Sequence, residues 1–248
     1  QGSIATSGEA VGNIEYELSE LSQDMFFEGV AGNLFVESGT PSVSTLEIGG
    51  DTLPTYTIVK HDKKVGLIQV FSGCRVEGKI TGSASISATG YSNPLATPVV
   101  SPLAPTETPF MSSINVNTFK INGASTVGTA CAESFTIAIN NNLTAKPCFI
   151  GENLIPNRYT EGKVSITLNV TLALTVASKA WIPYVETREN MTAEIGIEDS
   201  LGNAYGFNFT KLELDNDCLS DTNANDDHTL GMEFRHVKEA PTITRTTA

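Results

Sequence analysis

Hydrophobic and polar residues alternate along several short stretches of this chain. Near the N-terminus, the apolar residues Ile14, Tyr16 and Leu18 alternate with Glu15 and Glu17. A period of two places the two sets on opposite faces of a β-strand. We therefore predict a half-exposed strand here, whose apolar face packs on a core while the two glutamates point away from it.

The alternation recurs in two segments that reverse direction at a polar turn. Residues 55–76 begin with TYTIV, pass through the bend HDKK and return as GLIQVFSGCRV. Residues 192–214 contain alternating isoleucines, the turn EDSLGN and then alternating aromatic residues. Asp, Ser, Gly and Asn are the residues that tight reversals require. Both segments are therefore predicted to be β-hairpins.

Further strands are predicted in the sequences KITGSASISATG, SFTIAINNNL, GKVSITLNVTLAL and GMEFRHV. One segment, LSQDMFFEGVAGN, has helical spacing instead. It predicts a short helix over about residues 23–31 that packs on a sheet, with Ser22 as its N-cap and Gly32 as its stop signal. Leu21 and Phe26 stand at the positions of a hydrophobic staple around that cap.

These elements together predict the fold class. Roughly nine or ten strands and one short helix indicate an all-β fold of the β-sandwich or barrel type. The chain has 248 residues, which is enough to bury a core without a disulfide or metal staple. We therefore expect a single domain over residues 1–248.

A proline-rich segment interrupts the strands at residues 91–110. Proline cannot donate hydrogen bonds within a central strand, and this segment contains Pro94, Pro98, Pro102, Pro105 and Pro109. One interpretation is an exposed linker between two halves of the chain. The interpretation that we favour is an arm that lies on a neighbouring molecule at low entropic cost. A polar linker would not need the apolar residues Leu95, Val99, Val100, Leu103 and Phe110.

The chain is strongly acidic. It has 28 Asp and Glu against 15 Lys and Arg, a net charge of −13, and Lys60 is the first cation in the sequence. We therefore do not expect a basic surface for binding nucleic acid, since affinity for phosphates depends on cationic side chains. The acids either serve solubility or line a surface that must not hold DNA.

Residues 215–230 form a second unusual segment, rich in Asp and Asn. Asp221, Asn223 and Asn225 have the alternation of a calcium-binding loop. However, Asp226 stands where that loop needs glycine, and Met232 stands where it needs a bidentate glutamate. We interpret the segment as an acidic surface loop and predict no metal site.

The sequence contains few residues that suit catalysis. His61, His228 and His236 stand in turn, loop and strand contexts, without a nucleophile elbow, a zinc-binding HExxH or a phosphate-binding glycine loop. We therefore predict neither an enzyme nor a cofactor. The four cysteines allow two disulfides, but we favour reduced thiols that behave as small buried apolar residues. They are widely spaced, without a CxxC pair: Cys74, Cys131, Cys148 and Cys218.

No segment predicts a membrane span or export. The most apolar region, residues 164–185, is interrupted by Asn169, Lys179 and Pro183, and it falls short of the roughly 18 apolar residues of a span. The N-terminus lacks a basic region followed by an apolar stretch, so we expect no signal peptide. Without export, the N-x-T sequons carry no glycan: Asn142, Asn169, Asn190 and Asn208.

The order and spacing of these segments resemble the tail tube proteins of long-tailed, siphovirus-like bacteriophages. The pattern starts with GEAVGNIEYELS and its short helix and continues through LPTYTIV and FSGCRVEGKITGSASISATG. It ends with FTIAINNNL, IGENLIPNRYTEGKVSITLNV and AEIGIEDSLGNAYGFNFTKLEL. Residues 91–110 and 215–230 depart from the pattern.

This resemblance implies a structural virion protein. Its copies would form rings, either hexamers or trimers of a duplicated unit, that stack into a tail tube. Double-stranded DNA would pass through the lumen without specific binding, and Glu15 and Glu17 are candidate lumen acids. The implied partners are further copies and the tape-measure, tail-terminator and baseplate or tip proteins. The implied location is the phage tail, after assembly in the host cytoplasm and without a membrane.

Two other classes share the strand pattern. An extracellular pilus or adhesin-type β-sandwich subunit would require a secretory signal and would use disulfides. A β-sandwich binding module would require a pocket of clustered aromatic or acidic residues, whereas this chain has a single tryptophan, Trp181.

Overall fold

The computed structural model of the chain describes residues 10–39, 42–51, 53–62, 64–81, 84–93, 109–127, 130–146, 158–160, 162–215 and 228–248. Within these ranges the protein consists mainly of β-strands. The helices are short: α1 (Asp24–Ala31), α2 (Tyr184–Thr187) and the 3₁₀ turns η1 (Ser113–Asn115) and η2 (Ser178–Trp181). The predicted all-β class is confirmed, while closure into a sandwich or barrel and a single domain over residues 1–248 stay predictions.

Fourteen of the strands form one antiparallel sheet. Neighbours along its main path are, in order, β1 (Ala10–Tyr16), β7 (Ala84–Asn93), β6 (Leu67–Thr81), β11 (Ala132–Asn140), β14 (Ser165–Ala173), β17 (Thr229–His236), β16 (Ala204–Leu214), β15 (Met191–Glu198), β9 (Val116–Ile121) and β10 (Ala124–Ser125).

The other four strands of this sheet attach beside that path. β5 (Tyr56–Asp62) pairs with β6, β18 (Thr242–Thr246) pairs with β16 and β4 (Val43–Glu47), and β3 (Val36–Ser38) pairs with β4. Two small ribbons stand apart from the sheet. One joins β2 (Leu18–Ser19) to β8 (Phe110–Met111), and the other joins β12 (Thr144–Lys146) to β13 (Arg158–Thr160).

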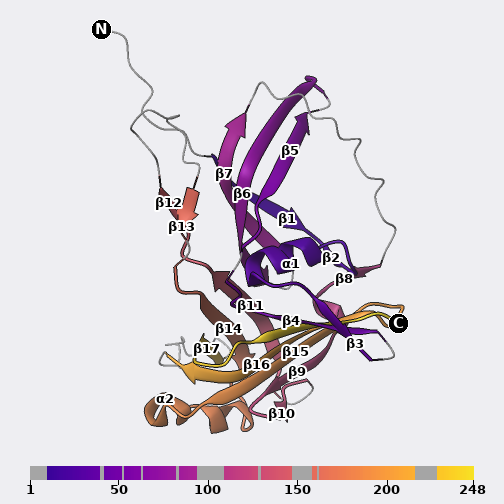
Figure 1. Cartoon of the computed structure of the whole chain (residues 1–248). Helices are drawn as coiled ribbons and strands as arrows, with labels where there is room; N and C mark the ends of the chain where they lie inside the picture. Colours follow the sequence, from indigo (N-terminus) through magenta and orange to yellow (C-terminus); the bar gives the residue numbers. More distant parts are fainter. Residues whose placement is uncertain are drawn as a thin grey trace.

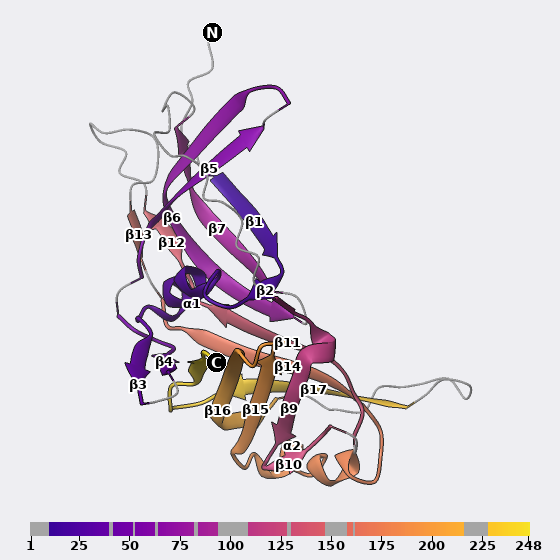
Figure 2. The ribbon, with the colours of Figure 1, turned by 90° about the vertical axis from the view of Figure 1, so that its right-hand side faces the viewer.

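Strands β1, β5, β6 and β7 project from the rest of the molecule (Figures 1 and 2). We call them the projecting sheet and the remaining strands the body. The 15-residue strand β6 belongs to both, because residues 67–74 pair with β5 and residues 78–81 pair with β11 of the body. The projecting sheet is therefore a continuation of the body's hydrogen-bonded ladder.

The first predicted hairpin is present as β5 and β6, which close with Asp62 opposite Leu67. The Asp62 carboxylate accepts hydrogen bonds from the backbone N–H groups of Lys64 (3.0 Å) and Val65 (3.2 Å). Gly66 donates its N–H to the Asp62 carbonyl (2.8 Å) and has a φ of 69°, which glycine adopts without strain. Local hydrogen bonds thus fix the turn.

The second predicted hairpin is present as β15 and β16, and Asp199 organises its turn. The Asp199 carboxylate accepts hydrogen bonds from the N–H groups of Leu201 (2.8 Å) and Asn203 (3.0 Å) and from the Asn203 side-chain amide (2.8 Å). Burial alone would raise the pKa of Asp199, but these hydrogen bonds favour the charged form and lower the pKa overall.

The core of the body lies between two portions of the sheet that face each other. Strand β16 divides the sheet, because residues 204–208 pair with β18 and residues 212–214 pair with β17. The rings of Phe119 on β9 and Phe135 on β11 are 5.9 Å apart, although four strands separate β9 from β11 along the sheet. The curved sheet therefore folds over one shared hydrophobic core.

Helix α1 matches the predicted helix and packs where projecting sheet and body meet. Its Phe27 ring contacts Tyr205 and Phe207 of β16, at centroid distances of 5.4 and 6.2 Å. The helix ends at Gly32, which has a left-handed φ of 72°. The predicted stop signal and the predicted packing on a sheet are confirmed.

The predicted start of α1 is wrong in detail. Gln23, not Ser22, occupies the N-cap, and no side chain caps the helix. Ser22 Oγ instead donates to the carbonyl of Ser19 (3.2 Å), while Gln23 Oε1 accepts from the Ser19 N–H (3.0 Å). Leu21 is exposed with a φ of 61°, so it is not a buried staple. The polar side chains tie the helix to β2 because that strand offers them nearby backbone partners.

A polar cluster joins α1 to the C-terminal strand β18. Arg245 forms an ion pair with Asp24, and its Nη2 donates to Ser44 Oγ (2.9 Å). Tyr205 Oη donates to the second carboxylate oxygen of Asp24 (2.5 Å), and burial followed by this hydrogen bond raises the pKa of Tyr205. The Asp24 and Arg245 side chains are only 14% and 16% exposed. The cluster therefore fastens α1, β4, β16 and β18 together in a largely desolvated setting.

Most of the two unusual segments lies outside the described residues. Of the proline-rich segment 91–110, residues 94–108 are not described, and its ends belong to β7 and β8. Of the acidic segment 215–230, residues 216–227 are not described. Their roles as an arm and a surface loop stay predictions.

Candidate functional site

The two candidate lumen acids lie at the edge of the projecting sheet. Glu15 is in β1 and Glu17 follows it directly, and both side chains are exposed. Ile14 and Tyr16 are half-buried and pack against the core, and Leu18 is buried. The predicted division of this strand into an apolar and an acidic face is confirmed. That the acidic face lines a lumen stays a prediction.

Of the candidate arm residues, the structure places only one. Phe110 lies in β8, which pairs with β2, and its side chain is exposed. The other four lie outside the described residues: Leu95, Val99, Val100 and Leu103. The inter-subunit arm therefore stays a prediction.

Several strand edges in the described part of the chain are open. Strands β1, β3, β5 and β10 each pair with a neighbour on one side only. An edge strand presents a row of N–H and C=O groups that can pair with another chain. The fold thus offers edges for association on both the projecting sheet and the body.

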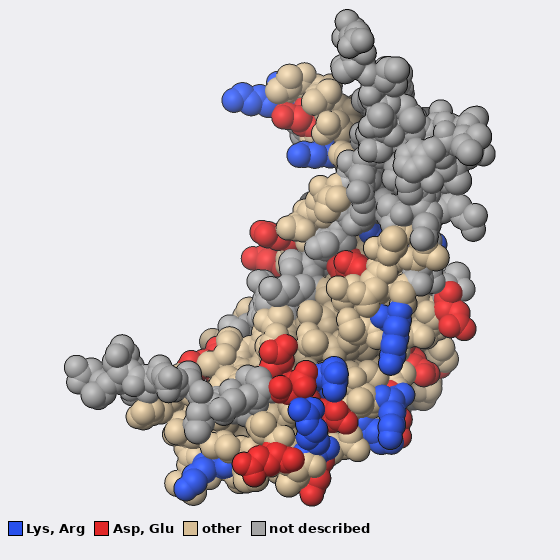
Figure 3. All heavy atoms as spheres, turned by 90° about the vertical axis from the view of Figure 1, so that its left-hand side faces the viewer, with Lys and Arg blue, Asp and Glu red and all other residues tan. Residues whose placement is uncertain are grey.

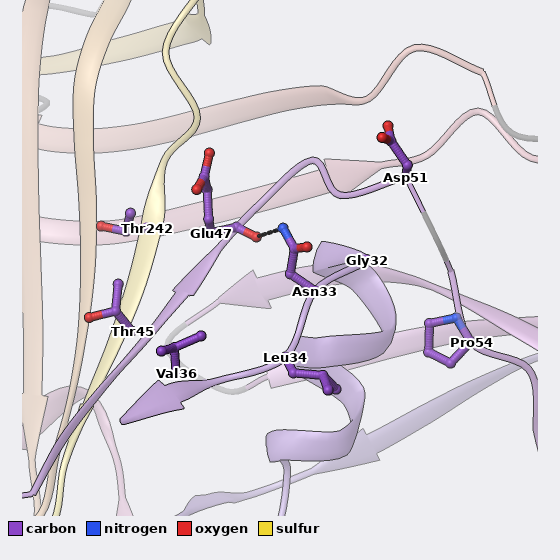
Figure 4. Close-up of a pocket in the computed structure, with 9 residues that line it drawn as sticks. All are labelled: Gly32, Asn33, Leu34, Val36, Thr45, Glu47, Asp51, Pro54 and Thr242. Carbon is purple, nitrogen blue, oxygen red and sulfur yellow. Dashed lines mark hydrogen bonds between the residues drawn. The ribbon is translucent and has the colours of Figure 1, made fainter. Parts of the chain in front are cut away.

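A groove of about 900 Å³ lies beside β3 (Figure 4), and we call it the β3 groove. Leu34 and Val36 line it while remaining 70% and 67% exposed. Its only charged residues are the acids Glu47 and Asp51, which Figure 4 shows on the side opposite Leu34 and Val36. The remaining lining residues are Gly32, Asn33, Thr45, Pro54 and Thr242.

Close backbone contacts build this groove. The N–H groups of Gly49 and Gly50 both donate to the carbonyl of Ala31 at the end of α1 (2.9 and 2.8 Å). A Cβ at Gly50 would lie 2.1 Å from the carbonyl oxygen of Gly32, so only glycine allows the loop to approach the helix this closely. Asn33 Nδ2 also donates to the carbonyl of Glu47 (2.9 Å). The acids of the groove are therefore held on a defined backbone.

A second groove, of about 460 Å³, lies between β1 and β5 on the projecting sheet. Its lining is mainly apolar, with Lys60 as the one charged residue: Val11, Gly12, Asn13, Ile14, Ile58, Val59, Lys60, Phe71 and Cys74. Among these, Val11 and Val59 are exposed. This face of the projecting sheet is thus apolar next to an open strand edge.

The turn between β5 and β6 is the free end of the projecting sheet. Val65 and Leu67 are 75% and 54% exposed there, and the side chains of Lys60 and Lys64 are also exposed. Figure 3 shows cations together with acidic atoms at this free end, and both kinds are also mixed on the body. Sequence reasoning identified the bend HDKK but not its importance as a basic site in an acidic chain.

The histidines do not form a catalytic constellation. His61 lies in β5, and His228 and His236 stand just before and at the end of β17, about 27 Å apart along an extended strand. Burial, and then Lys163, lower the pKa of His236. Within the described ranges, no group of three His, Cys, Asp or Glu side chains is arranged to hold a metal ion. Met232, at the would-be twelfth loop position, is buried in β17.

The structure shows two of the four cysteines, both as free thiols. Cys74 is buried and Cys131 is exposed. Burial raises the pKa of the Cys74 thiol, which reduces its reactivity at neutral pH. Cys148 and Cys218 lie outside the described residues.

A family model described as phage tail tube protein matches residues 1–243 of this chain. The match runs from before β1 to the start of β18 and so covers nearly the whole sequence. A search of curated proteins finds no match. Among the described residues, no helix is long and apolar enough to span a membrane.

Proposed function

Because the chain belongs to the phage tail tube protein family, we propose that its copies form rings, with six copies each, that stack into a hollow tail tube. The family assigns a structural role in the phage tail, which is not that of an enzyme. The match over residues 1–243 carries the proposal, and it also argues against a pilus subunit or a binding module.

The open strand edges support association between copies. A strand edge left unpaired in water is a template for pairing, and ring closure satisfies such edges with neighbouring copies. Stacking of rings is a head-to-tail contact, which is heterologous and does not close on itself. Repetition of that contact produces a filament of unlimited length.

The charge of the chain supports passage of DNA through the tube. A net charge of −13 leaves little cationic surface to neutralise phosphates. We place the exposed acids Glu15 and Glu17 in the lumen, where they repel the DNA backbone and keep the duplex from adhering to the wall. DNA then passes during ejection without specific binding.

The head-to-tail contact between rings also indicates which other tail proteins the chain contacts. Nothing in a heterologous contact limits filament length, so other tail proteins must set it. We therefore propose contacts with the tape-measure, tail-terminator and baseplate or tip proteins. Assembly takes place in the host cytoplasm, and the finished protein resides in the virion tail.

Sedimentation of the purified protein tests self-association. We expect particles far larger than the 26.3 kDa chain, and we expect millimolar dithiothreitol to leave them intact, because strand pairing and packing hold the copies together. The variant Cys131→Ser, which removes an exposed thiol, should sediment like the wild type. A protein that stays monomeric at every concentration contradicts the proposal. Dissociation by the reductant would instead assign the contacts to disulfides.

A further inference from the structure

The turn between β5 and β6 presents a basic and apolar tip. We define the hairpin tip as Lys60, Lys64, Val65 and Leu67, all of which are exposed. Hydrogen bonds to the Asp62 carboxylate and carbonyl fix its backbone. A rigid turn loses little conformational entropy when it binds, so these exposed side chains are pre-organised for a contact.

The charge of this tip is exceptional for the chain. No Lys or Arg precedes Lys60 in the sequence, and residues 60–64 contain three of the 15 cations, Lys60, Lys63 and Lys64, against the single acid Asp62. Exposed valine and leucine beside lysines form an amphipathic surface that water solvates poorly. A partner that fits the tip therefore has acidic side chains next to apolar surface.

The β3 groove has the complementary composition. Leu34 and Val36 supply exposed apolar surface, and Glu47 and Asp51 supply negative charge without a cation among the nine lining residues. The whole groove apart from Thr242 comes from the part of the chain that precedes the first lysine. The groove is thus opposite in charge to the tip, and both surfaces have exposed apolar residues.

The tip cannot reach the groove of its own chain. Pro54 lines the groove and stands just before β5, whereas the tip lies at the other end of that seven-residue strand. Seven residues of strand span about 23 Å. Figures 1 and 2 likewise show the end of the β5–β6 hairpin far from β3. A contact between tip and groove must therefore join two copies.

We propose that the hairpin tip of one copy docks in the β3 groove of the next copy. Lys60 and Lys64 then face Glu47 and Asp51, and the apolar residues of the tip cover Leu34 and Val36. The opposite charges set the register, and the apolar contact removes exposed hydrophobic surface from water. This inference rests on the proposed function, since it names the contact through which the copies associate head to tail.

Charge reversal tests the pairing. The tip variant Lys60→Glu/Lys64→Glu and the groove variant Glu47→Lys/Asp51→Lys each place like charges opposite one another. We expect each to raise the critical concentration for assembly by at least about tenfold, and we expect the variant with all four changes to return to within about threefold of the wild type. The control Lys179→Glu/Lys238→Glu makes the same charge change as the tip variant at exposed positions elsewhere and should assemble normally.

Cross-linking provides a second measurement that does not depend on lost assembly. In the variant Leu34→Cys/Val65→Cys, oxidation with copper–phenanthroline should produce a ladder of dimers, trimers and longer chains, because each copy offers one tip and one groove. Val65→Cys alone controls for cross-linking to the native cysteines and should give no ladder.

The outcomes separate the two proposals. This inference is wrong if the wild type assembles and the charge-reversed variants assemble equally well. It is also wrong if the variant with all four changes does not recover assembly. In either case another surface occupies the groove. Absence of the ladder in assembled protein has the same meaning. If the wild type does not assemble at all, the tube proposal itself fails.

Discussion

Replacing Asp24 with alanine is expected to lower the free energy of unfolding by about 3–5 kcal/mol, because it leaves a desolvated guanidinium without its charged partner. Arg245 is only 16% exposed, and its ion pair with Asp24 is the charged contact inside the cluster. Tyr205 loses its acceptor in the same variant. Urea titration of the dispersed subunit, followed by the fluorescence of the buried Trp181, measures the change.

A matched control distinguishes this pair from an ordinary surface pair. Lys120 and Glu194 form an ion pair whose side chains are 42% and 48% exposed. Glu194→Ala is therefore expected to change the free energy of unfolding by less than about 1 kcal/mol. If Asp24→Ala costs no more than this control, the cluster does not fasten α1 to the C-terminal strand.

The double substitution Glu15→Lys/Glu17→Lys is expected to slow DNA ejection strongly at low salt. Each change adds two charges, so a ring of six copies gains about +24, and a cationic lumen neutralises phosphates and retains the duplex. At low ionic strength we expect ejection from phage particles to slow by at least about tenfold, with recovery as salt rises and screens the attraction. Both side chains are exposed, so the subunits should still fold and assemble.

The control for this prediction places the same charges elsewhere. Glu186 lies in α2 and Glu189 just after it, both exposed and far from the projecting sheet (Figure 1). Glu186→Lys/Glu189→Lys should leave ejection unchanged. Ejection of the Glu15→Lys/Glu17→Lys particles at the wild-type rate at every salt concentration would put these two residues outside the channel.

Local patterns explain why much of the fold was predictable from sequence. Alternating burial in β15 and β16, with Ile195, Ile197 and Phe207 inside, follows directly from the period of a strand. The turn at Asp199 was predictable because its hydrogen bonds join residues at most four positions apart. Gly32 ended α1 for a similarly local reason, its left-handed φ.

Contacts between distant residues explain most of what was missed. Asp24 and Arg245 are 221 positions apart, and no pattern along the chain indicates that they meet. The N-cap error has a different, local origin, because Ser22 Oγ donates to the carbonyl of Ser19, three positions away, instead of capping the helix. The β3 groove depends on the approach of Gly50 to Gly32, which only tertiary structure reveals. The lysines of the bend HDKK can be seen in the sequence. The acidic β3 groove, which we propose as their partner, is formed only by the fold.

Electron microscopy of the negatively stained, purified protein would show whether the copies form a hollow tube. We expect rings, or tubes built of stacked rings, with stain filling a central hole along the axis. Dispersed globular particles, or solid filaments without a central channel, would contradict the assignment of this chain as the wall of a DNA-conducting tube.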